Sequence, residues 1–177
     1  MRLFIAVEID ETLRSKIADV QKQLAEDALK LVEPENLHVT LKFIGEVPDE
    51  KAAEIAGRLK AVTMAPFEVR IGGIGAFPNE NYVRVVWIGL EGALAELAAR
   101  VEASLEGLDY IKKDRYEFSS HLTIARVKTR SKYLSQRLQG LKDLEIGTQL
   151  AERFFLVKST LTPQGPIYEH IAEFRLG

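Results

Sequence analysis

The apolar residues of this chain follow two spacings in turn, every second residue and every third or fourth. Residues 2–9 alternate and are rich in strand-forming side chains, which predicts a first strand. Asp10 is a favourable N-cap for a helix, and the apolar residues that follow it recur at helical spacing, at Leu13, Ile17, Val20 and Leu24. The chain is therefore predicted to begin with a strand that leads directly into an amphipathic helix.

The same two spacings predict the remaining elements. Strands are expected over 37–46, 67–74, 82–90 and 118–127, helices over 48–62, 91–107 and 131–141, and two or three strands over 145–176 with breaks at Pro163 and Gly165-Pro166. Several strands follow one another without room for a crossover helix, which favours an α+β fold with largely antiparallel sheets over a doubly wound parallel sheet. No linker rich in proline, glycine and serine interrupts the sequence, so residues 1–177 are expected to form a single domain.

A four-residue pattern of histidine, apolar residue, threonine and apolar residue occurs twice, at 38–41 and at 121–124. These two copies contain two of the three histidines in the chain. Successive side chains of a strand point to opposite faces, so each histidine shares a face with its threonine, roughly 7 Å along the strand. Two such strands facing each other would surround one cleft with two imidazoles and two hydroxyls, those of His38, Thr40, His121 and Thr123.

Such a set of groups suits acid–base chemistry at a phosphorus atom. Imidazole has an unperturbed pKa of about 6.5, so one ring can be protonated while the other is neutral near pH 7. One histidine could then take a proton from the attacking hydroxyl while the other gives a proton to the leaving oxygen. The threonine hydroxyls could donate hydrogen bonds to the phosphate oxygens. Neither motif has a further histidine or carboxylate close by, so no metal site is expected.

Four other features of the sequence bear on the site. Arg126 follows His121 by five residues, so strict alternation places it on the opposite face, and it reaches the cleft only if the strand bends or ends there. Lys42 shares the parity of His38 and is expected on the cleft side. His170 has no threonine partner and is expected to be a surface or structural residue. The glycine-rich stretch at 72–75 lacks the lysine of a phosphate-binding loop.

Composition sets limits on location and partners. The net charge of −2 argues against a protein that coats nucleic acid electrostatically, although a cleft needs only local positive charge. No apolar run approaches the roughly 20 residues of a membrane helix, so no membrane association is expected. The absence of cysteine and of a targeting signal leaves the cytoplasm as the expected location. No additional apolar stripe stands out, which favours a monomer.

The two motifs and their surroundings resemble a known family. Residues 34–47 and 121–126 are similar to the two motif regions of the 2H phosphoesterase superfamily, and more closely to those of the RNA 2′,3′-cyclic phosphodiesterases, also called 2′-5′ RNA ligases. Residues 2–7 resemble the opening strand of that family and residues 159–168 its closing strands. The chain departs from many relatives at Ser120, where they have proline.

The resemblance implies a bilobal fold with pseudo-twofold symmetry, two mainly antiparallel sheets with outer helices, and motif strands facing a central cleft. It implies hydrolysis of an RNA 2′,3′-cyclic phosphate end to a 2′-phosphate, without a metal or a cofactor. His38 would be the proton donor to the leaving oxygen and His121 the proton acceptor from water. Thr40, Thr123 and Arg126 would bind the phosphate. The reverse reaction would join RNA through a 2′-5′ bond.

Two other functions remain open at this point. The same two histidines could act on a small cyclic phosphate nucleotide or an ADP-ribose-type substrate, because the motifs do not specify substrate size. The cleft could also belong to a non-catalytic module that binds RNA ends. Binding alone needs arginine and lysine more than an acid–base pair, so the presence of both histidines favours an enzyme.

Overall fold

Two antiparallel sheets form the framework of the computed structural model, which describes residues 1–113 and 117–177. The first sheet has the strand order β3-β1-β8-β9, and its strands are β1 (Arg2–Glu8), β3 (His38–Glu46), β8 (Arg153–Thr162) and β9 (Gly165–Arg175). The second sheet has the order β2-β6-β5-β4-β7, and its strands are β2 (Leu29–Leu31), β4 (Phe67–Asn79), β5 (Tyr82–Glu91), β6 (His121–Val127) and β7 (Glu145–Ala151). The α+β prediction with antiparallel sheets is confirmed.

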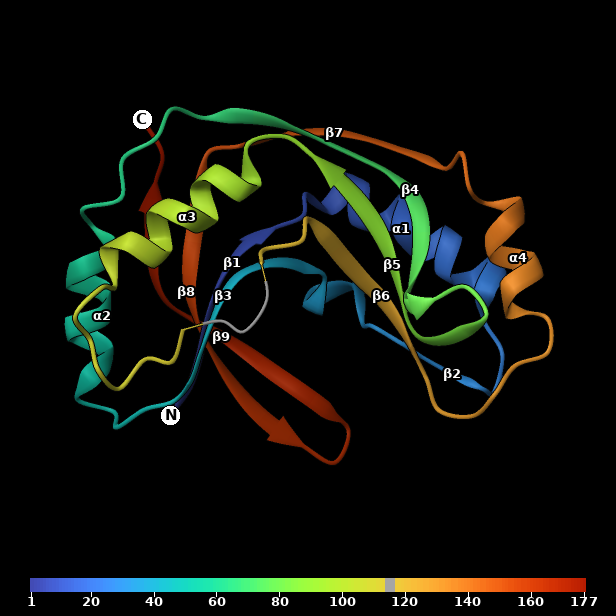
Figure 1. Ribbon diagram of the computed structural model, residues 1–177, viewed down its shortest axis with the longest axis horizontal. Coiled ribbons are helices and arrows are strands. Elements are labelled where there is room, and N and C mark those ends of the chain that lie inside the picture. Colours follow the sequence, from blue (N-terminus) through green and yellow to red (C-terminus); the bar gives the residue numbers. More distant parts are fainter. Residues whose placement is uncertain (114–116) are drawn as a thin grey trace.

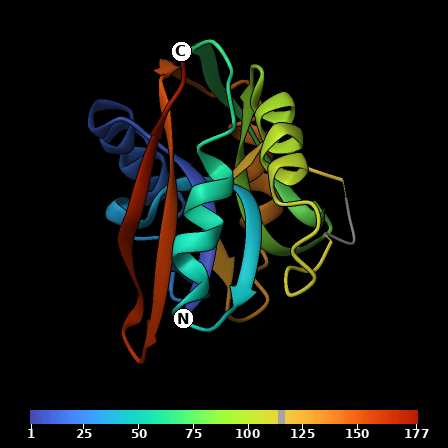
Figure 2. The same ribbon diagram turned by 90° about the vertical axis from the view of Figure 1, so that its left-hand side faces the viewer.

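The helices lie on the outer faces of the sheets, as Figures 1 and 2 show. They are α1 (Glu11–Leu24), α2 (Lys51–Leu59), α3 (Leu94–Ser104) and α4 (Leu134–Gly140), with a short 3₁₀ turn η1 (Pro34–Asn36) before β3. None of the helices among residues 1–113 and 117–177 is long and apolar enough to cross a membrane.

The chain crosses between the two sheets. Helix α1 leaves β1 of the first sheet but packs against β6 and β7 of the second. Helix α3 leaves β5 of the second sheet but packs against β3 of the first. Each sheet therefore receives one helix from a strand of the other sheet, and most of the buried apolar residues of both sheets join one contiguous core.

The central strand of the first sheet, β1, is buried on both of its faces. Leu3, Ile5 and Val7 belong to the main core under the helices. Phe4 and Ala6 point to the opposite face, where they form a smaller cluster with Phe155 of β8. That second face also carries the first motif, because the Phe4 ring lies 4.8 Å from the ring of His38. The small cluster is therefore an apolar floor beneath the first histidine.

The observed elements differ from the predicted ones at a few places. Strand β4 continues to Asn79 rather than ending at residue 74, because a bulge at Gly73, with φ of 69°, restores the pairing with β5 beyond the glycines. The three-residue strand β2 was not predicted. Asp10 occupies the N-cap position of α1 as expected, but its carboxylate forms no capping hydrogen bond. Its backbone N–H instead donates to Gln149 Oε1 at 3.0 Å.

Candidate active site

The two motif strands, β3 and β6, contact each other where the two sheets meet (Figure 1). Each strand begins with its histidine. The apolar residues that follow the histidines, Val39 and Leu122, are buried, whereas His38 and His121 are only partly buried. The predicted alternation therefore holds over the first residues of both motifs. The apolar side chains on one face anchor each strand in the core, and the other face carries the polar groups.

The two histidines are held in the same way. His38 Nδ1 lies 2.7 Å from the carbonyl oxygen of Asn36, and His121 Nδ1 lies 2.8 Å from the carbonyl oxygen of Ser119. A carbonyl oxygen can only accept a hydrogen bond, so each Nδ1 carries a proton and donates it. In the neutral ring, Nε2 is then the basic nitrogen. Both imidazoles therefore present Nε2 as the atom that can exchange a proton with a substrate.

Each imidazole also rests against an aromatic side chain. The ring of Tyr168 meets the His38 ring nearly edge-on, with centroids 5.2 Å apart and an interplanar angle of 87°. The ring of Phe77 meets the His121 ring in the same manner, at 5.0 Å and 88°. These contacts restrict the rotation of both imidazoles without using their nitrogen atoms. The two halves of the site thus match in the packing of an aromatic ring against each histidine.

The support behind His121 depends on a glycine. Trp87 is paired with Gly75 on the neighbouring strand, and its ring lies so close that a Cβ on Gly75 would overlap the Trp87 ring. Trp87 in turn contacts Phe77, with ring centroids 5.4 Å apart. Gly75 therefore makes room for the tryptophan that backs the ring contacting His121. A larger residue at position 75 would displace this series of aromatic contacts.

A β-bulge in each motif strand changes the face of the residues that follow. In β6, Thr123 pairs with Trp87 and Ala125 with Val86, which leaves Ile124 as the extra residue. In β3, Leu41 is the extra residue in the same position of the motif. A bulge adds one residue to one strand and reverses the alternation beyond it. Both motifs therefore contain the same local irregularity, directly after the threonine.

The bulge in β6 brings Arg126 to the face of His121 and Thr123, where it is exposed. The charge of Arg126 acts to lower the pKa of Tyr168, whose ring contacts His38, while burial raises that pKa overall. Arg126, on the second sheet, is thus close enough to influence Tyr168, the residue that contacts His38 on the first sheet. Strict alternation predicts Arg126 on the opposite face unless the strand bends or ends. The bulge is the bend that brings Arg126 to the face of His121.

The bulge in β3 has the opposite consequence for Lys42. The prediction that Lys42 points to the cleft side is wrong, because the extra residue Leu41 turns Lys42 towards the helices. Its side chain is only 2% exposed, and Nζ lies 2.7 Å from Glu102 Oε2 of α3. Phe43 takes the cleft-side position that Arg126 has on the other strand, and it is 61% exposed. The two halves of the site therefore differ at this position, which is aromatic on one side and cationic on the other.

Helix α1 fixes the bulge in β6. Gln21 is almost fully buried, and its Nε2 donates at 2.8 Å to the carbonyl oxygens of Val32 and Ile124. The Ile124 carbonyl also accepts from the backbone N–H of Val32 at 2.9 Å. A buried amide that satisfies two backbone carbonyls is costly to remove. Gln21 therefore holds in place the backbone irregularity on which the position of Arg126 depends.

Glu8 is a site residue that the sequence did not indicate. It pairs with His38 across β1 and β3, and its charge acts to raise the pKa of that histidine. Burial is the larger influence and lowers the pKa of His38 overall, against the contributions of the Asn36 carbonyl and of Glu8. The free protein thus favours the neutral form of His38 more than an exposed histidine would, and Glu8 limits this effect.

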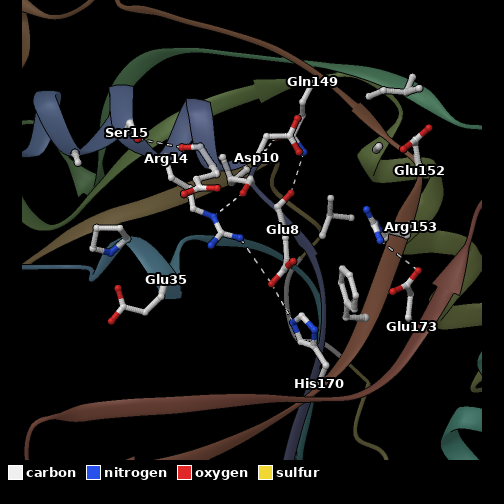
Figure 3. A pocket seen from close by; sticks show the side chains of 18 residues that line it. Glu8, Asp10, Arg14, Ser15, Glu35, Gln149, Glu152, Arg153, His170 and Glu173 are labelled. Carbon is white, nitrogen blue, oxygen red and sulfur yellow. Dashed lines mark hydrogen bonds and ion pairs between the residues drawn. The ribbon is translucent and has the colours of Figure 1, made fainter.

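The third histidine lies at the edge of a cavity of about 770 Å³ on the other side of Glu8 (Figure 3). His170 Nε2 lies 2.9 Å from Glu8 Oε1, and its ring stacks on Phe155 with centroids 4.2 Å apart. Arg14 approaches the same carboxylate, at 3.8 Å. His170 is 44% exposed, as expected for a surface residue. Among the described residues, no group of three or more histidine, aspartate or glutamate side chains is arranged to hold a metal ion.

Replacing Glu8 by glutamine should lower the pKa of His38 further. The glutamine keeps the size of the side chain but removes the negative charge that stabilises the imidazolium, so His38 loses its proton at a lower pH. An NMR titration of the His38 ring protons measures the change. Glu35→Gln is the matched control, because this exposed carboxylate precedes His38 by three residues and does not contribute to its pKa. An unchanged or raised pKa of His38 in the Glu8 variant would contradict the prediction.

Known proteins resemble this chain in sequence and in fold. The LigT-like phosphoesterase family model matches residues 3–87. Two proteins named RNA 2′,3′-cyclic phosphodiesterase, from Methanocaldococcus jannaschii and Archaeoglobus fulgidus, are 44% and 42% identical to this chain, over 98% of its length and 100% and 99% of theirs. A crystal structure of a Thermus thermophilus protein has a TM-score of 0.85 and 32% identity, covering 99% of this chain and 97% of its own. Escherichia coli LigT, crystallised with 3′-AMP, shares the fold at a TM-score of 0.83 and 21% identity, covering 99% of this chain and 97% of its own.

Two antiparallel sheets that bring matched histidine–threonine strands together define a phosphoesterase of the two-histidine, or 2H, class. The similarity to the named relatives extends over the full chain and includes both halves of the site. The chain belongs to the LigT-like phosphoesterase family.

Proposed function

We propose that this protein hydrolyses the 2′,3′-cyclic phosphate at the end of an RNA strand to a 2′-phosphate. The observation that carries the proposal is the matched pair of imidazoles, each with Nδ1 held by a backbone carbonyl two residues upstream and Nε2 left to exchange a proton. The naming of full-length relatives as RNA 2′,3′-cyclic phosphodiesterases supports the choice of substrate. The core that both sheets share supports the proposal that residues 1–177 act as a single catalytic domain.

In the proposed reaction the two histidines exchange protons on opposite sides of phosphorus. His121 Nε2 takes a proton from a water molecule as the water oxygen attacks the phosphorus atom. The bond between phosphorus and the 3′ oxygen breaks, and His38 Nε2 donates a proton to that oxygen. The products are a 2′-phosphate and a 3′-hydroxyl. In the reverse direction a 5′-hydroxyl replaces water, the roles of the two histidines exchange, and the strands are joined through a 2′-5′ bond.

The groups around the histidines would stabilise the negative charge of the transition state. Thr40 Oγ1 already lies 3.0 Å from His38 Nε2, so its hydroxyl borders the position of the phosphate. Thr123 and Arg126 occupy the same face of the second strand, and a guanidinium can bind two phosphate oxygens at once. The phosphate also supplies the negative charge that raises the pKa of a nearby imidazole, which opposes the effect of burial on His38 and favours its donor form.

The test is turnover of an RNA oligonucleotide with a 2′,3′-cyclic phosphate end, in buffer with and without EDTA, followed by identification of the product end. We expect a 2′-phosphate product and the same rate in both buffers, because the proposed groups are all side chains of the protein. A cyclic mononucleotide serves as a second substrate. Turnover of the mononucleotide alone would favour a small-substrate enzyme, and RNA binding without turnover of either substrate would favour a binding module. A rate that depends on a metal would overturn the mechanism.

A further inference from the structure

A second cavity, of about 1150 Å³, begins at the candidate phosphate-binding residue Arg126. Its walls come from the start of β5, the end of β6, the loop that leads from β6 to α4 and the start of α4, over residues 81–85, 126–132 and 134–135. We call it the β6 groove. Figure 1 shows that this loop lies at the end of the molecule opposite α2. The β6 groove therefore extends the site away from the first sheet, along the surface of the second.

The β6 groove is lined by positive charge alone. Its titratable lining residues other than Tyr82 are all exposed arginines and lysines, namely Arg84, Arg126, Lys128, Arg130 and Lys132. Within residues 1–113 and 117–177, none of these five forms an ion pair with a carboxylate. Five cations without counterions on one surface are unfavourable in the absence of an anionic ligand.

This charge is segregated within an acidic chain. The net charge of the protein is −2, so the positive charge of the groove does not reflect an excess of basic residues in the whole protein. The cavity beside His170 has the opposite character, because its lining includes six carboxylates, those of Glu8, Asp10, Glu11, Glu35, Glu152 and Glu173. Of the two cavities, only the β6 groove therefore suits a polyanion, and it is the one that borders Arg126.

The β6 groove also offers surfaces for bases and sugars. Tyr82 is 54% exposed, and the Arg84 guanidinium lies 5.4 Å from the centre of its ring. Arg84 also donates to the Tyr82 hydroxyl at 3.0 Å, which holds the two groups together. Nucleobases stack on exposed aromatic rings and on guanidinium planes. Cations along a groove, combined with such a platform, are typical of sites for single-stranded nucleic acid.

We propose that the β6 groove binds the nucleotides that precede the cyclic phosphate in a single-stranded RNA substrate, and this inference rests on the proposed function. Arg126 connects the candidate active site to the β6 groove, because it shares a face with His121 and also lines the start of the groove. A strand whose terminal phosphate lies at Arg126 therefore passes Lys128, Arg130 and Lys132 with its next phosphates. The groove makes the protein favour an oligonucleotide over a mononucleotide that carries the same reactive end.

The test compares two matched double variants. Arg130→Gln with Lys132→Gln removes two charges from the groove, outside the catalytic machinery. Arg58→Gln with Lys60→Gln removes the same two residue types from exposed positions in the last turn of α2 and at its C-cap, at the other end of the molecule. The first measurement is binding of an RNA oligonucleotide with a 2′-phosphate end, by fluorescence anisotropy at several salt concentrations. The second is turnover of an oligonucleotide and of a cyclic mononucleotide, each with a 2′,3′-cyclic phosphate.

For the groove variant we expect weaker oligonucleotide binding and a dependence of log Kd on log salt that is shallower by about 1.4, since each contact of a cation with a single strand contributes about 0.7. KM for the oligonucleotide should rise, while turnover of the cyclic mononucleotide stays at the native level and shows that the variant is folded. The α2 variant should match the native protein in every measurement.

The failure of the two proposals can be told apart. If the groove variant and the α2 variant bind the oligonucleotide equally well and with the same salt dependence, the inference about the groove is overturned, whatever the turnover shows. If the native protein turns over neither substrate, the proposed function fails. The binding comparison then still decides whether the groove holds RNA.

Discussion

Replacing either His38 or His121 by alanine is expected to lower kcat for hydrolysis of the RNA cyclic phosphate by about 10²- to 10⁴-fold. Each variant loses one of the two proton transfers while the rest of the site stays in place. Both rings are only partly buried and lie at the start of their strands, so the anchoring residues Val39 and Leu122 are unaffected. Single-turnover hydrolysis of an oligonucleotide with a 2′,3′-cyclic phosphate end measures the loss.

His170→Ala is the matched control for both substitutions, because it removes the remaining histidine from an exposed position. It should leave kcat close to the native value. In the double variant of His38 and His121 the loss should be much smaller than the product of the two single losses, because residues that act as a unit are not additive. Native-like turnover in both single variants would rule out the two-histidine mechanism.

Replacing Arg126 by alanine is expected to lower kcat/KM by about 10²- to 10³-fold, comparable to the removal of one group that stabilises transition-state charge. Arg126→Lys should recover part of this loss, because lysine keeps the charge but lacks the planar pair of donors that fits two phosphate oxygens. The measurement is kcat/KM on the cyclic mononucleotide, which reports the terminal phosphate without contributions from the β6 groove.

Arg58→Ala serves as the control for Arg126, because this arginine is exposed on α2, a helix that supplies none of the proposed site residues. Its activity should equal that of the native protein. If Arg126→Ala retained native kcat/KM on the mononucleotide, Arg126 would have no part in binding the reacting phosphate, and its place at the start of the groove would be its only role.

The alternation of side chains along a strand was enough to predict to which face of the sheet each motif side chain points. Val39 and Leu122 are buried as expected, and each histidine lies on the face of its threonine. The same rule misplaced Lys42 and left Arg126 undecided. A bulge depends on which residues the neighbouring strand offers for pairing, and this information is not contained in the bulged segment itself.

Residues that support the histidines from other strands could not be found from spacing. Glu8, Phe77 and Tyr168 come from three different strands, and only the tertiary fold brings them to the imidazoles. Glu8 shares its parity with Phe4 and Ala6, so the alternation of β1 held a partial signal for its facing. The crossing of α1 and α3 to the opposite sheets also lay beyond sequence patterns, because an amphipathic helix shows that it has an apolar face but not which sheet receives it.

The repeated bulge has a consequence for how this site is encoded. Removing one residue between Thr123 and Arg126 would restore regular pairing and turn the arginine away from the histidines, although every functional side chain would still be present. The same holds for Phe43 after Thr40 on the other strand. In each half of the molecule the residue types therefore decide which chemical groups the site has. The number of residues between the site residues decides to which face of the sheet each group points. An insertion or deletion of a single amino acid here would move the following side chain to the other face of the sheet. A comparison of the site residues by type alone would not detect this change.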